Sequence, residues 1–74
     1  MDYAERMRGI REDADLTQTQ IAEILYVCQR TYSDYELKNA RIPLESMIKL
    51  AKFYNVDMNY ICGISNEIRP YPTK

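Results

Sequence analysis

The chain has 74 residues, of which 46% are hydrophobic, ten are basic and eleven are acidic, and its net charge is −1. This length suffices for one compact domain, and the composition is too apolar for a disordered chain. Residues 1–10 carry four charges, and no apolar run approaches the ~20 residues of a membrane helix, so we expect neither a signal peptide nor a membrane span.

The reactive side chains are few. Cys28 and Cys62 are not spaced as a zinc-binding pair, and no histidine is present to complete such a site. We therefore expect no metal, a cytoplasmic location and reduced thiols that act as small packing groups. The sequence also has no glycine-rich phosphate loop and no nucleophile–base pair, so we expect neither an enzyme nor a cofactor.

The first expected helix runs from Tyr3 to about Ala14, because Met7, Ile10, Arg11 and Ala14 recur at helical spacing. The second, residues 18–25, follows a capping box formed by residues 17 and 20. Its expected core residues are Ile21, Ala22 and Leu25.

The third expected helix begins at Cys28 or Gln29 and continues to about Leu37, after a tight break at residues 26 and 27. Tyr32 and Tyr35 form its inner face, with Leu37 nearby. Its outer face carries the polar residues Gln29, Arg30, Ser33 and Asp34.

The fourth expected helix spans residues 44–54 and follows Ile42-Pro43, a typical helix start. Its apolar residues recur with the spacing of a core face: Leu44, Met47, Ile48 and Ala51. A short fifth helix over residues 58–62 follows a cap at residue 57 and ends before Gly63. We divide the chain into a domain of residues 1–64 and a short irregular tail of residues 65–74.

Several segments in this order resemble the phage-repressor family, the lambda repressor and Cro-like or "xenobiotic response element" proteins. They are LTQTQIA (16–22), VCQRTYSDYE (27–36), IP (42–43), LESMIKLAKFYNV (44–56) and residues 57–63. The resemblance implies an all-α, five-helix, lambda-repressor-like domain with its helix-turn-helix at the second and third helices. It also implies a sequence-specific regulator of transcription, a homodimer whose third helix enters the major groove of a near-palindromic site on double-stranded DNA.

Within this resemblance, two sets of residues are expected to meet DNA. The base-reading set is Gln29, Arg30, Ser33 and Asp34, whose side chains match adenine, guanine and cytosine edges. The phosphate-binding set is Gln18, Thr31, Lys38 and Arg41. The alternatives are plain solvation of these polar groups and, for Asp34, neutralisation by Arg30 four residues earlier.

Two further sets of residues have expected structural roles. The resemblance implies a partly buried ion pair between Arg11 and Glu36, which would explain a charge on the apolar stripe of the first helix. A dimer surface is expected at the C-terminal end of the domain, unless its residues only close the core. Its residues are Met58, Tyr60, Ile61 and Ile64.

The sequence departs from the family pattern around the third helix. Tyr26 and Lys38 stand where the family commonly has glycine, and Cys28 replaces the usual serine or threonine cap. We expect Asn39, rather than Lys38, to adopt the left-handed conformation after that helix.

Net charge favours a competing function. Most nucleic-acid binders have a basic excess, so a charge of −1 is compatible with a protein-interaction module, an antitoxin or a scaffold, of the same fold. The seven tyrosines could also stack on single-stranded bases, but Tyr32, Tyr35 and Tyr54 fall on core stripes and are interpreted as core residues.

Overall fold

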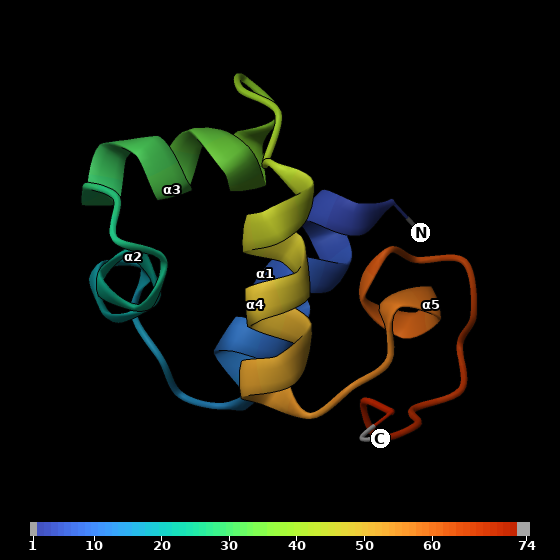
Figure 1. The fold of residues 1–74 in the computed structure, drawn as a ribbon. Coiled ribbons are helices and arrows are strands. Elements are labelled where there is room, and N and C mark those ends of the chain that lie inside the picture. Colours follow the sequence, from blue (N-terminus) through green and yellow to red (C-terminus); the bar gives the residue numbers. More distant parts are fainter. Residues whose placement is uncertain (1, 73–74) are drawn as a thin grey trace.

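The computed structural model describes residues 2–72 and contains the helices α1 (Tyr3–Asp13), α2 (Gln18–Leu25), α3 (Gln29–Leu37), α4 (Leu44–Tyr54) and α5 (Met58–Ile61). No strand occurs in these residues, so the expected all-α, five-helix fold is confirmed. In Figure 1, α3 lies across the top of the molecule, with α2 below it. The close contacts of α3 are with α2 and α1, and α1 also packs against α5.

Side-chain caps fix the starts of three helices. Asp2 accepts a hydrogen bond from the backbone N–H three residues later at 2.9 Å, and Asp57 does the same at 2.8 Å. At α2 the predicted capping box is present, because Thr17 and Gln20 each accept from the other's backbone N–H, at 3.1 and 2.8 Å. Each such cap stabilises its helix by about 1 kcal/mol.

Left-handed residues end most of the helices. Asp15, Tyr26, Lys38 and Asn55 have φ between 57° and 64°. The expectation that Asn39 takes this role after α3 is therefore wrong. Lys38 directly follows the last helical residue, and its left-handed turn lets the next N–H return to the carbonyl of residue 34 at 2.9 Å.

The core lies where all five helices meet, and its largest fully buried side chains are Met7, Ile21, Tyr32, Leu50 and Ile61. Two expectations about core residues are wrong. Leu44 is 68% exposed, because the first turn of α4 borders a surface cavity, and the core stripe begins one turn later at Met47. Leu37 is also exposed, since two residues after Tyr35 correspond to about 200° around the helix.

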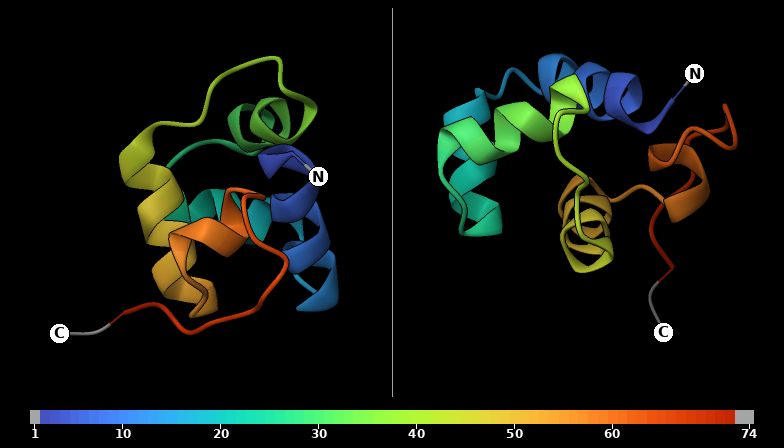
Figure 2. Two further views of the ribbon diagram at one scale, coloured as in Figure 1. Left: turned by 90° about the vertical axis from the view of Figure 1, so that its right-hand side faces the viewer. Right: turned by 90° about the horizontal axis from the view of Figure 1, so that it is seen from above.

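The segment after α5 has no helix up to residue 72, yet it is held against the rest of the domain. The backbone N–H of Asp57 donates to the carbonyl of Arg69 at 2.8 Å, and that of Tyr71 donates to Asn55 Oδ1 at 3.2 Å. The left view of Figure 2 shows this segment passing α1 and returning below α5. Residues 73 and 74 of the expected tail lie outside the described residues.

Candidate nucleic-acid interface

A tight turn of residues 26–28 joins α2 to α3. Tyr26 makes the turn with φ 60° and ψ 40°, and its ring, 85% exposed, lies against the Lys49 ammonium, which is 4.5 Å from the ring centroid. A bulky residue in this conformation costs on the order of 1 kcal/mol. At the start of α3, Cys28 makes no capping hydrogen bond to the backbone, as its chemistry predicts.

The Cys28 side chain instead hydrogen-bonds the hydroxyl of Thr31, with Sγ and Oγ1 3.1 Å apart. This bond lowers the pKa of the exposed Cys28 thiol. The Thr31 hydroxyl, one of the expected phosphate contacts, is therefore already engaged at the first turn of α3.

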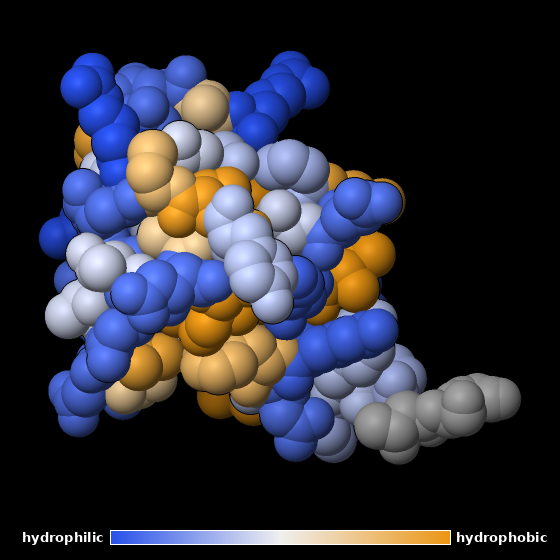
Figure 3. All heavy atoms as spheres, turned by 60° about the vertical axis from the view of Figure 1, so that its left-hand side comes forward, coloured by the Kyte–Doolittle hydropathy of each residue, from blue (hydrophilic) through white to orange (hydrophobic). Residues whose placement is uncertain are grey.

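The outer face of α3 holds the four expected base-reading residues. Gln29 and Arg30 are exposed, and Ser33 and Asp34 are half-buried. No ion pair joins Arg30 to Asp34 within residues 2–72, so the alternative in which these two neutralise each other is not seen. Figure 3 shows mostly hydrophilic side chains at the top of the molecule, where α3 and the loop after it lie.

A chain of side-chain hydrogen bonds connects this face to the interior. Gln29 Nε2 donates to Gln18 Oε1 at 2.7 Å, and Gln18 Nε2 donates to Glu36 Oε1 at 3.1 Å. The Gln18 side chain thus links α2 to both ends of α3. This link was not predicted from the sequence, which led us to expect a phosphate contact for Gln18 and, independently, a base contact for Gln29.

Arg11 and Glu36 form an ion pair at the inner end of this chain. Arg11 Nε donates to Glu36 Oε2 at 2.8 Å, and the two side chains are 12% and 3% exposed. The bond to Glu36 raises the pKa of Arg11. For Glu36, burial is the largest single influence and would raise the pKa, but the hydrogen bonds from Arg11, Gln18 and neighbouring groups together lower it.

The remaining basic candidates differ in their surroundings. Lys38 forms an ion pair with Asp2, with Nζ and Oδ2 3.3 Å apart, and both side chains are substantially exposed. Arg41 is exposed and has neither a hydrogen bond nor an ion pair to any described residue. Arg41 is therefore the cation in this loop that is most available to an external anion.

The expected dimer surface is only partly on the surface. Ile64 is 77% exposed and Met58 and Tyr60 are half-buried, but Ile61 is 0% exposed. The assignment of Ile61 to a partner-facing surface is wrong, because α5 is a single turn whose inner side closes the core.

A second buried arginine, Arg6, lies near this surface and was not predicted from the sequence. Arg6 donates to the carbonyl oxygens of Tyr60 and Ser65 at 2.8 and 3.1 Å, and to Asn66 Oδ1 at 2.9 Å. Its guanidinium also lies over the Tyr60 ring, 4.0 Å from the centroid. The sequence did contain a signal, because Arg6 lies on the same side of α1 as Tyr3 and Ile10. A charge on this apolar side implies a buried partner, but that reasoning was applied only to Arg11.

Two of the three tyrosines interpreted as core residues are fully within the core. Tyr32 and Tyr35 are buried and pack edge-to-face, with ring centroids 6.3 Å apart, whereas Tyr54 is half-buried. Burial raises the pKa of Tyr32 far above its ordinary value and that of Tyr54 to about 12. Among residues 2–72, neither the Tyr32 nor the Tyr54 hydroxyl has a partner in full hydrogen-bonding geometry, although the nearby Glu36 carboxylate also contributes to raising the pKa of Tyr32. The Tyr32 and Tyr35 rings hold α3 against the core and are too deeply buried to stack on bases.

Within residues 2–72, no three histidine, cysteine, aspartate or glutamate side chains lie close enough together to hold a metal ion. Over the same residues, no helix has both the length and the hydropathy that crossing a membrane requires.

Comparison with protein families gives one match that covers most of the chain. A helix-turn-helix family model matches residues 7–61, a range that begins within α1 and ends with α5. A crystal structure of a transcriptional regulator from Listeria innocua superposes on the chain with a TM-score of 0.81 and 27% sequence identity. This superposition covers 90% of the present chain and 63% of the other.

Two curated relatives have similar sequences. The chain is 32% identical over 68 residues to the uncharacterized HTH-type transcriptional regulator YobD of Bacillus subtilis, over 92% of this chain and 61% of the relative. It is 37% identical over 54 residues to the cryptic phage CTXphi transcriptional repressor RstR of Vibrio cholerae, over 73% and 49%. The chain therefore spans about half to three fifths of the length of these relatives.

Proposed function

The chain belongs to the helix-turn-helix family, as its sequence indicated, and from this premise we propose that it regulates transcription by binding a specific sequence of double-stranded DNA. In this proposal α3 enters the major groove, and two copies bind a near-palindromic site whose halves lie about one helical turn apart. The names of the relatives support regulation of transcription. The function would place the protein in the cytoplasm, together with the DNA.

The observation that carries the proposal is the exposed amide of Gln29 and the way it is held. Glu36 is ionised and can only accept hydrogen bonds, so Gln18 must donate its N–H to it and present its oxygen to Gln29. Gln29 in turn must donate one N–H to Gln18. Among the described residues, its own oxygen and second N–H have no partner, and these are the two groups that a glutamine uses to bind adenine in the major groove.

The rest of the α3 face extends the contact to neighbouring bases and phosphates. Arg30 is exposed and has no partner among residues 2–72, so its guanidinium is available to guanine or to a phosphate. Ser33 and Asp34 lie further along the helix, where Asp34 can accept from cytosine. Thr31, Lys38 and Arg41 complete the phosphate contacts, which hold the helix in register.

Dimerisation through the C-terminal part of the domain completes the proposal. Because Ile61 is buried, the proposed dimer surface consists of Met58, Tyr60 and Ile64. A small domain with an apolar area of this kind gains stability from association with a second copy. Two copies would place two α3 helices on the same side of the dimer, as a two-fold DNA site requires.

The test is binding to a library of genomic fragments at two salt concentrations, followed by anisotropy measurements on the selected sequence. We expect affinity to fall as salt rises, because phosphate contacts release counterions. Gln29→Ala and Arg30→Ala should each weaken binding to that sequence by about tenfold or more and relax the preference at one base pair. Arg69→Ala removes a comparable exposed arginine, paired only with Glu67, and should have little effect.

Retention of the same fragments at the same affinity by both α3 variants would show that α3 does not read the bases. The competing function, a protein-interaction module, is favoured by the net charge of −1. Such a module would bind duplex DNA weakly and without a steep salt dependence, so the same measurement separates the two functions.

A further inference from the structure

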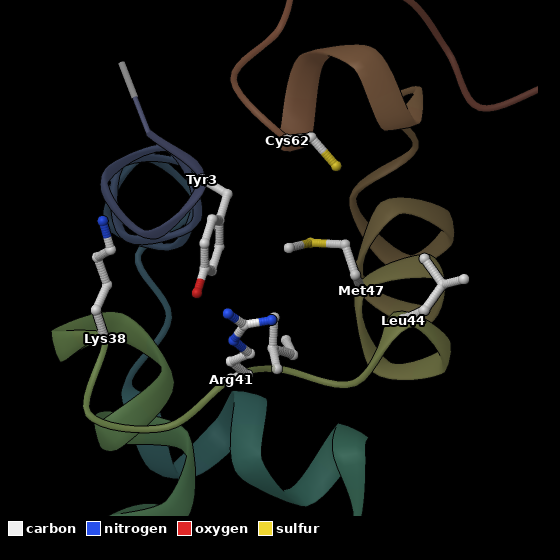
Figure 4. Close-up of a pocket in the computed structure, with 7 residues that line it drawn as sticks. Tyr3, Lys38, Arg41, Leu44, Met47 and Cys62 are labelled. Atoms are coloured by element: carbon white, nitrogen blue, oxygen red, sulfur yellow. The ribbon is translucent and has the colours of Figure 1, made fainter.

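A surface cavity of about 530 Å³ lies beside the loop that follows α3. It is bordered by the start of α1, the loop, the first turns of α4 and the end of α5. Figure 4 shows the side chains of Tyr3, Arg41, Met47 and Cys62 converging on this space. The volume falls within the range of small-molecule sites, roughly 300–1,000 Å³.

The lining combines an apolar wall with one available cation. Ile42, Leu44 and Met47 supply apolar surface, and Leu44, the first residue of α4, is 68% exposed. Arg41 has no partner among the described residues, whereas Lys38 is already paired with Asp2. In Figure 4 the Tyr3 hydroxyl points toward the Arg41 guanidinium, so both donors face the same volume.

A flat anionic group attached to an apolar body matches these features. A guanidinium binds a carboxylate through two parallel hydrogen bonds, and a tyrosine hydroxyl can donate a third. A small apolar body would cover the exposed surface of Leu44 and contact the Met47 side chain where it lines the cavity.

A second copy of the chain fits this cavity less well. If the two-fold axis of a dimer passed near this cavity, the Arg41 of one copy would approach the Arg41 of the other. Like charges brought together in this way repel each other. The charge at the rim therefore favours a small anion over a second copy.

We propose that this cavity is a binding site for a small amphipathic carboxylate, held by Arg41 and Tyr3 with its apolar part against Leu44 and Met47. The proposal extends to regulation of DNA binding, and in this part it rests on the proposed function. A guanidinium that is bound to a carboxylate cannot also bind a phosphate, so the ligand and DNA would each weaken the binding of the other by the same factor.

The test uses 4-phenylbutyrate as the probe and its uncharged isostere 4-phenylbutanamide as the control ligand, on protein without DNA. In ¹³C-methyl spectra of the methionines, the Met47 resonance should shift on addition of the carboxylate, while that of Met58, which does not line this cavity, should not. For a ligand of this size we expect a Kd of about 1 mM or tighter. The amide should bind about tenfold more weakly, because it cannot form the charged pair.

Matched variants identify the residues. Arg41→Gln should weaken binding of 4-phenylbutyrate about tenfold and Tyr3→Phe by a smaller factor, while Arg69→Gln, an exposed arginine outside the cavity, should leave it unchanged. Circular dichroism of each variant checks that the fold is retained. Equal affinity for acid and amide, a shift of Met58 rather than Met47, or no binding at about ten times the expected Kd would overturn the proposal.

Sedimentation and DNA titration distinguish the remaining outcomes. If Arg41→Gln changes the monomer–dimer equilibrium measured by sedimentation but does not change probe binding, this face is an interface with a second copy. That result would overturn the ligand site. If the probe binds as expected and the protein also binds DNA, saturating probe should weaken DNA binding by about tenfold or less, and should have no effect on Arg41→Gln. If the protein binds no DNA, the proposed function fails while the probe titration still decides the ligand site.

Discussion

The helix-turn-helix unit and the C-terminal segment each depend on one arginine of α1, but the two arginines have different kinds of partner. Arg11 binds the carboxylate of Glu36 and, through it, joins a series of side chains that extends to the exposed Gln29 at the start of α3. Arg6 binds the backbone carbonyl groups of Tyr60, in α5, and of Ser65, in the segment after α5. A side-chain partner such as Glu36 can be recognised in the sequence by its residue type, whereas every residue has a backbone carbonyl group.

This difference explains why the two regions respond differently to substitution. Loss of a side-chain partner of Arg11 leaves a buried charge, which is strongly unfavourable. Loss of Arg6 leaves carbonyl groups near the surface, which water can satisfy once the segment moves. We therefore expect global destabilisation in the first case and local opening in the second.

The largest effect is expected for Arg11→Ala. Glu36, 3% exposed, would lose its cation, and the free energy of unfolding should fall by about 3 kcal/mol. Arg8→Ala on the same helix removes an exposed pair with Glu12 and should cost less than about 0.5 kcal/mol. Urea unfolding followed by circular dichroism measures both. Equal losses in the two variants would show that the Arg11–Glu36 pair does not stabilise the domain.

An intermediate effect is expected for Arg6→Met, which keeps the length of the side chain but removes its donors. The free energy of unfolding should fall by about 2 kcal/mol. Hydrogen exchange should accelerate first at the amides of Ile64 and Ser65, which bond to the carbonyl of Asn59. Uniform acceleration, including the Ile21 amide in α2, would contradict local opening.

The smallest effects are expected at Tyr26 and Gly63, two of the positions with positive φ. Tyr26→Gly should stabilise the domain by about 0.5 kcal/mol, because relief of the positive φ exceeds the lost contact with Lys49 and the added freedom of the unfolded chain. Gly63→Ala, at φ 82°, should destabilise it by about 1 kcal/mol. Thermal unfolding detects both. A less stable Tyr26→Gly variant would show that the tyrosine ring contributes more than its strain costs.

Most of the fold could be predicted because its signals are local. The capping box at Thr17, the caps at the other helix starts and the apolar spacing depend on residues within one turn of each other. The errors arose where the burial of a residue depends on segments that are distant in the sequence. The exposure of Leu44 depends on the cavity between α1 and α4, and the burial of Ile61 depends on how α5 docks, which no residue near it in sequence determines.

The candidate site was predictable as a set of residues, through family resemblance, but its internal connections were not. The sequence indicated that Gln29 and Arg30 face outward, and the structure leaves both exposed. It did not indicate that Gln18 and Gln29 hydrogen-bond each other, because two glutamines eleven residues apart have many equally plausible arrangements. The role of Arg6 was missed because its partners are mainly carbonyl groups, which have no signature in a sequence.

The bond between the two glutamines has a consequence for how base preference could change. A glutamine on a helix surface ordinarily swivels, and it can then present either its oxygen or its nitrogen to a nucleobase. In this protein the Glu36 carboxylate fixes the orientation of the Gln18 amide, which in turn fixes that of the Gln29 amide. If the Gln29 amide flipped, its oxygen would face the oxygen of Gln18. If α3 reads bases as we propose, a new preference could therefore arise from a substitution at Glu36, behind the exposed face of α3, with no change at Gln29 itself.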